Sequence, residues 1–180
     1  WHALQKRMEA YNEPWMIIIT TDHGRKVGGR GHGGQSDEER ATWIVSNKKF
    51  NDVFQQTPGI VSIFPTIAHF MDINIPKNQA MELDGAGLLG EAYASHLSGE
   101  LDGNSLKLSW KSYSSKAKAK IWATSTNQFK YGETDIYRLV GEVSLADQED
   151  VMDLKIQYEN LKVVMELPNG FINVWVTNKE

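Results

Sequence analysis

The sequence of 180 residues contains no cysteine, which excludes disulfide bonds, a thiolate zinc site and a cysteine nucleophile. It has no apolar run of the length that crosses a membrane, so no membrane segment is expected. Acidic residues outnumber basic ones by 23 to 19, which excludes an overall basic field for nucleic acid as a dedicated partner. The remaining composition, 41% hydrophobic and 23% charged, is that of an ordinary globular chain.

An apolar run at residues 15–20 ends abruptly in Asp22-His23-Gly24, and His32 follows between glycines. A run that is apolar on both alternating faces is typical of a buried strand covered by helices. The end of such a strand delivers side chains to the carboxyl edge of an open α/β sheet, where these folds bind ligands. Carboxylate and neutral imidazole suit zinc and related divalent ions. Asp22, His23 and His32 are therefore candidate metal ligands.

The stretch from Thr20 to Gly24, the later Gly31-His32-Gly33 and the acidic residues 37–39 resemble the alkaline phosphatase superfamily. The likeness is greatest to its type I phosphodiesterase/nucleotide pyrophosphatase branch, and segments 41–47 and 62–67 extend it. The resemblance implies a partial α/β catalytic domain over residues 1–90 that binds two divalent ions, with zinc the expected metal. It places Asp22 and His23 on one ion and His32 on the other.

Two parts of that family have no counterpart in this sequence. The nucleophile segment, in which Thr or Ser follows a metal-binding Asp, is absent, and so is an Asp-x-x-x-His pair. The chain therefore resembles the C-terminal part of a longer hydrolase that acts on phosphoester substrates. We expect this part to be inactive alone, and we assign none of its residues a catalytic role. The resemblance favours a bacterial protein of the periplasm or cell surface, whereas the residues themselves leave the compartment open.

Local signals place several elements in the first half of the chain. Trp1, Leu4, Met8 and Tyr11 share one face of a predicted helix, which ends at 12–14 before a strand at 15–20. Ser36 and Glu39 have the spacing of a capping box at a helix start. A second strand is predicted at 42–46, and a short helix is predicted from Ser62 or Pro65 through Met71.

The pattern changes at about Leu83, where glycines punctuate a connecting stretch as far as Gly103. Apolar residues then alternate with polar ones in runs at 106–110, 117–123, 136–143, 161–167 and 171–177. Short strands joined by turns such as Pro168-Asn169-Gly170 predict an antiparallel sandwich of the immunoglobulin or fibronectin III kind over residues 91–180. This half resembles a small domain of unknown function that follows some bacterial phosphodiesterase-like proteins.

Other interpretations remain open at this point. A sulfatase or phosphomutase of the same superfamily shares the Asp-His-Gly and His-Gly elements, and a non-catalytic module that binds glycan or protein is the alternative outside enzymes. Trp110, Trp122 and Trp175 then form either a sugar platform or, more simply, part of the core. Arg25, Lys26 and Arg30 either attract an anionic substrate or belong to a solvated loop. An open sheet edge in the first half also predicts self-association.

Overall fold

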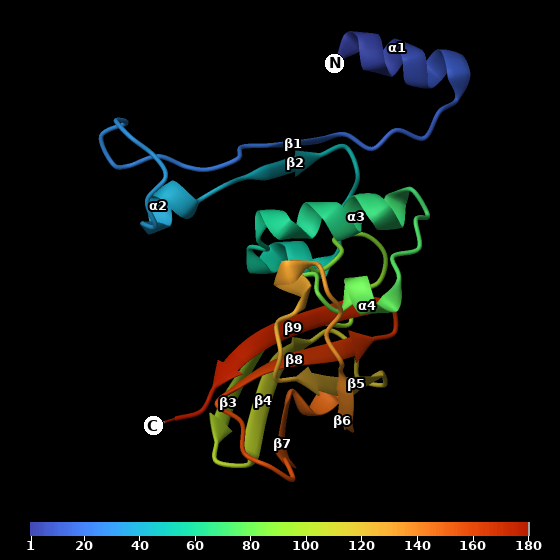
Figure 1. Ribbon diagram of the computed structural model, residues 1–180. Helices are drawn as coiled ribbons and strands as arrows, with labels where there is room; N and C mark the ends of the chain where they lie inside the picture. The colour runs from blue at the N-terminus through green and yellow to red at the C-terminus, as the bar shows by residue number, and fades with distance from the viewer. Residues whose placement is uncertain (180) are drawn as a thin grey trace. The chain divides into compact units, whose positions relative to one another are not determined.

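The computed structural model describes residues 1–179 (Figure 1). By packing, the chain divides into two compact units, Trp1–Lys49 and Phe50–Glu180. The sequence predicts a division near residue 90 instead, at the end of the partial α/β domain. The difference arises because residues 50–90 pack against the sandwich that follows them. No helix in the described part has the length and apolar character needed to cross a membrane.

The first unit contains two helices and two short strands. They are α1 (His2–Tyr11), β1 (Ile18–Thr20), α2 (Asp37–Arg40) and β2 (Ile44–Ser46). The α1 helix ends as predicted, with Asn12 in the left-handed conformation that terminates helices. The strands β1 and β2 form one antiparallel pair in which Ile19 lies opposite Val45.

This first unit has no apolar core among residues 1–49, all of which the structure describes. Its single buried residue is the acidic Glu39, while Ile19 and Val45 are each 55% exposed. The prediction of a buried strand at the edge of an open α/β sheet is therefore not met within these residues. The three-residue strand β1 pairs only with β2, and no helix of residues 1–49 buries it. Isolated two-stranded hairpins of this kind are only marginally stable.

The second unit is built around an antiparallel β-sandwich, as predicted for the C-terminal half. One sheet has the order β3-β4-β7 and the other β6-β5-β8-β9. The core between them is formed by inward residues of both sheets, including Leu106, Leu108, Ile121, Val163 and Met165. The strands are β3 (Ala94–Asp102), β4 (Ser105–Ser112), β5 (Lys118–Thr124), β6 (Arg138–Ser144), β7 (Glu149–Asp153), β8 (Asn160–Leu167) and β9 (Gly170–Thr177).

Strand β3 lies where the sequence predicts a connecting stretch, and Gly99 explains the difference. A Cβ atom at Gly99 would lie 2.7 Å from Cγ1 of Val176 in β9. The glycine therefore permits the close approach of β3 to β9 that closes one edge of the sandwich. Strand β7 was also not predicted, because Glu149–Asp153 has little apolar alternation to signal it.

Residues 50–90 form a layer of short helices on the outer face of the four-stranded sheet (Figure 1). The α3 helix (Ile63–Phe70) confirms the predicted helix in this region. Asn51 ties the start of this layer to its end by donating hydrogen bonds to the carbonyl oxygens of Gly87 and Leu88. The helices are η1 (Asp52–Gln56), η2 (Ile60–Ser62), α3 (Ile63–Phe70) and α4 (Lys77–Ala80).

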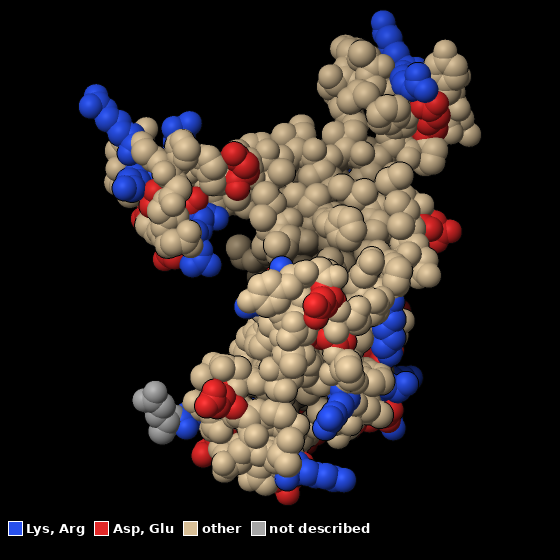
Figure 2. Space-filling model, in the orientation of Figure 1, with Lys and Arg blue, Asp and Glu red and all other residues tan. Residues whose placement is uncertain are grey.

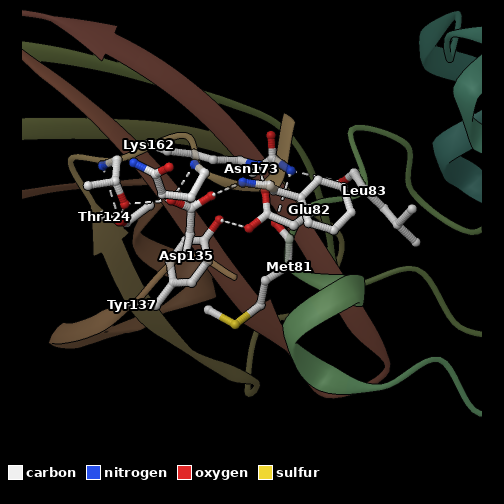
Figure 3. A network of polar contacts seen from close by, with 11 residues as sticks. Met81, Glu82, Leu83, Thr124, Asp135, Tyr137, Lys162 and Asn173 are labelled. Carbon is white, nitrogen blue, oxygen red and sulfur yellow. Dashed lines mark hydrogen bonds and ion pairs between the residues drawn. The ribbon is translucent and has the colours of Figure 1, made fainter. Parts of the chain in front are cut away.

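A buried polar network joins the segment after α4 to this sheet (Figure 3). Lys162 of β8 donates to one oxygen of Glu82 at 2.5 Å, and the Tyr137 hydroxyl donates to the other at 2.6 Å. Asn173 of β9 donates to the carbonyl oxygens of Met81 and Leu83. The sheet is thus covered on both faces, so residues 50–90 and the sandwich form one packing unit.

Candidate functional site

The predicted ligands lie in the loop between β1 and α2, which is held closed by its own backbone and by Glu39. The N–H of Gly24 donates to the carbonyl oxygen of Glu39 at 2.9 Å. A Cβ atom at Gly24 would lie 1.9 Å from the carbonyl oxygen of Glu38, so only glycine fits beside α2. The two ends of the loop are therefore locked against each other.

The Glu39 carboxylate organises the other side of the loop. The N–H of Gly34 donates to it at 2.9 Å and the Ser36 hydroxyl at 3.1 Å, while the Glu39 N–H donates to the Ser36 hydroxyl. The capping box predicted from Ser36 and Glu39 is therefore confirmed, and it also reaches back to Gly34. The hydrogen bond from the Gly34 N–H is the main reason that the pKa of Glu39 lies below its ordinary value.

His23 has a fixed ring orientation with one free nitrogen. Its Nδ1 lies 2.6 Å from the carbonyl oxygen of Gly24, and because a carbonyl only accepts, Nδ1 carries the proton. In the neutral ring, Nε2 then keeps its lone pair, which is the arrangement typical of a metal-binding histidine. Nε2 faces the Asp22 carboxylate, with 3.5 Å between Nε2 and Oδ2.

His32 comes next to His23 although nine residues of sequence separate them. The two rings stack with their centroids 4.5 Å apart and their planes at 19°. The structure thus brings both predicted imidazoles together, with the exposed Asp22 carboxylate beside one of them. Within residues 1–179 no group of three or more His, Cys, Asp or Glu side chains forms a complete metal-binding cluster.

The pair formed by Asp22 and His23 fits part of a metal shell. Two ligands at zinc distances with a tetrahedral angle stand about 3.3 Å apart, close to the 3.5 Å between Nε2 and Oδ2. The Asp22 carboxylate is exposed, so a proton on Nε2, a bridging water or a metal ion each fits this separation. The separation of the two atoms is therefore compatible with a shared divalent ion, although the described residues form no group of three or more such ligands.

The basic residues of the loop lie outside this closed region. Arg25, Lys26 and Arg30 are exposed, and Figure 2 shows Lys and Arg side chains projecting into solvent in the region of α2. Their exposure is compatible with both interpretations drawn from the sequence, attraction of an anionic substrate and a solvated loop.

The three tryptophans of the sandwich do not form a common platform. Trp110 is buried in the core, where its Nε1 donates to the carbonyl oxygen of Leu145. Trp122 on the outer face donates to Glu166 and lies under the ammonium group of Lys77, 4.2 Å from the ring centroid. Of the three, Trp175 is the most exposed, at 42%. Core packing and local ion pairing account for the first two, so a sugar platform gains no support.

Comparison with known proteins yields no relative: no family model, no curated protein and no solved structure matches this chain.

Proposed function

We propose that the loop at residues 21–40 supplies part of the metal centre of a phosphoester hydrolase of the phosphodiesterase/nucleotide pyrophosphatase kind. In this proposal Asp22 and His23 bind one divalent ion and His32 binds a neighbouring one, with zinc as the expected metal. The remaining ligands and the hydroxyl nucleophile come from polypeptide outside these 180 residues. The chain alone is then inactive, and the resemblance further suggests a bacterial parent in the periplasm or at the cell surface.

The observation that carries the proposal is the orientation of His23. The Gly24 carbonyl holds the proton on Nδ1, which leaves Nε2 as a lone-pair donor directed at the Asp22 carboxylate. A metal-binding histidine is generally oriented in this way, through a hydrogen bond from its second nitrogen.

The roles of the chain's own residues follow from the loop geometry. Glu39 and Gly24 fix the loop so that His23 and His32 stay adjacent, which reduces the entropy lost when they bind an ion. Divalent ions bound there supply Lewis acidity and lower the pKa of a hydroxyl nucleophile. Arg25, Lys26 and Arg30 raise the local concentration of an anionic phosphoester.

The exposed apolar surfaces support the larger domain that this proposal requires. The α3 helix contains no Asp, Glu, Lys or Arg, and with η2 it presents Ile60, Phe64, Ile67 and Met71 to solvent at helical spacing. Figure 2 shows the wide uncharged surface in this region. A contiguous exposed apolar patch of this kind is typical of a surface that another part of a protein covers. We therefore propose that residues 1–90 belong to an α/β domain, of which residues 50–90 pack on the immunoglobulin or fibronectin III-like accessory domain that follows.

Zinc titration of the 180-residue chain by calorimetry tests the metal site. We expect weak, saturable binding, because only part of each shell is present. Asp22→Asn or His23→Ala should lower the affinity at least about tenfold, and His2→Ala on α1 should leave it unchanged. Absence of zinc binding, or equal binding by the double variant His23→Ala/His32→Ala, contradicts the proposal.

The reaction is tested on the full gene product that contains these residues. We expect zinc-dependent hydrolysis of bis(4-nitrophenyl) phosphate, with kcat/KM at least about a hundredfold lower in His23→Ala. Turnover of 4-nitrophenyl sulfate alone would instead identify a sulfatase. Phosphodiester hydrolysis that His23→Ala leaves intact would refute the assigned role of this loop.

A further inference from the structure

The sandwich has a cavity at one edge, between β6 and the residues that follow β7. This is the edge opposite the one where β3 meets β9. The cavity has a volume of about 410 Å³ and borders the core. Few contacts join β6 to β7, so this edge stays open to solvent. The wall residues come from the end of β5, the loop after it, β6, residues 154–158 and the start of β8.

The cavity has an apolar interior that reaches the core. Leu154 and Leu161 at its base are buried members of the core cluster. Ile136 and Ile156 at its mouth are 80% and 54% exposed, although both belong to the cavity lining. These two large aliphatic side chains are exposed beside an opening to the core. An apolar ligand that covered them would be stabilised, because it would remove their surface from water.

One charged residue, Arg138, belongs to the lining of this cavity, and it is exposed to solvent. Arg138 pairs with Ala123 across β5 and β6, which places it on the core-facing side of the sheet. Its guanidinium has no ion-pair or hydrogen-bond partner among residues 1–179. The lining includes no Asp, Glu, Lys or His, and the Asp135 carboxylate behind the wall is bonded to the Thr126 hydroxyl and to backbone N–H groups, not to Arg138.

One part of the cavity wall is fixed by the buried carboxylate of Asp135. Asp135 accepts hydrogen bonds from the Thr126 hydroxyl and from the N–H groups of Gln128 and Phe129. These bonds fix the loop that contributes Thr126, Gln128 and Thr134 to the lining. A cavity held in shape before binding loses little conformational entropy when it takes a ligand.

We propose that this cavity binds a small organic anion with an apolar body, of the class of medium-chain carboxylates. The carboxylate pairs with Arg138, whose planar fork matches carboxylate geometry, and the alkyl chain covers Ile136, Ile156 and Leu154. One unpaired cation favours a head group with one negative charge. The site lies in the second unit and is independent of the proposed metal centre.

Binding of sodium decanoate to the 180-residue chain, followed by calorimetry and by NMR shifts of backbone amides, tests the proposal. We expect shifts confined to residues 123–140 and 154–161, and an affinity roughly tenfold or more lower in Arg138→Met. Decanol, which has the same chain without the charge, should bind the wild type more weakly than decanoate does. Its affinity should not change in Arg138→Met.

Charge changes at an exposed wall position provide matched controls that leave the core intact. Ile136→Glu should abolish decanoate binding and Ile136→Lys should retain it, whereas Leu139→Glu on the other face of β6 should have no effect. Absence of decanoate binding, equal binding by Arg138→Met, or shifts centred on α3 would overturn the proposal. Arg138 would then be an inward charge that keeps an edge strand from pairing with other chains.

Discussion

The pair formed by Glu82 and Lys162 allows a sharp test of how residues 50–90 are fixed to the sandwich. The side chains are only 4% and 5% exposed, and the Tyr137 hydroxyl binds the second oxygen of the same carboxylate. Lys162→Met leaves that carboxylate buried with one neutral donor. Removing one partner of a buried ion pair costs about 3–5 kcal/mol, because the remaining charge is uncompensated.

The loss is large compared with the roughly 5–15 kcal/mol by which a domain is usually stable. Urea unfolding followed by tryptophan fluorescence measures it, since Trp110 and Trp122 lie in the same sandwich. We expect the midpoint for Lys162→Met to fall without a change in the slope, as for a loss of stability in a two-state transition. The double variant Glu82→Leu/Lys162→Met should recover most of the loss, because it leaves no unpaired charge.

A solvent-exposed pair in the same sheets serves as the matched control. Lys118 of β5 and Glu142 of β6 also form an ion pair at 2.9 Å, but their side chains are 69% and 49% exposed. Lys118→Met should therefore cost less than about 1 kcal/mol. The reasoning is refuted if Lys162→Met costs no more stability than Lys118→Met. It is also refuted if the double variant loses as much stability as Glu82→Leu and Lys162→Met lose in sum.

Two further predictions concern the loop and the response to acid. Gly24→Ala should separate the His23 and His32 rings, seen as changed NMR signals of both imidazoles, because the new Cβ meets backbone oxygen; Gly29→Asn, at an open position with positive φ, should not. Unchanged imidazole signals in Gly24→Ala would contradict the loop geometry. Although burial raises the pKa of Asp135, its three hydrogen bonds outweigh that effect and hold the pKa below the ordinary value. Its stabilisation is thus present above about pH 4 and is lost as the pH falls through the lowered pKa, so Asp135→Asn should destabilise more at pH 7 than at pH 2. Equal destabilisation at both values would count against this account.

The sequence predicted the elements whose signals are local. The alternation at 117–123 and 161–167 corresponds to β5 and β8, and the Ser36 and Glu39 spacing identified a true capping box. The glycines around His23 and His32 likewise indicated a tightly bent loop, and the two imidazoles do lie together. Whether they hold metal ions stays a prediction, since other ligands are needed to complete each shell.

Tertiary structure alone decided the features that depend on residues distant in sequence. Gly99 suggested a break in regular structure, yet its missing side chain is what lets β3 approach Val176. Nothing local to Glu82 or Lys162 indicated that they would meet, because 80 residues separate them. Arg138 gave no signal either, since its cavity is assembled from three separate stretches of chain. Periodicity and capping are properties of neighbouring residues and can be read along the chain, whereas burial and charge pairing depend on which surfaces the fold brings together.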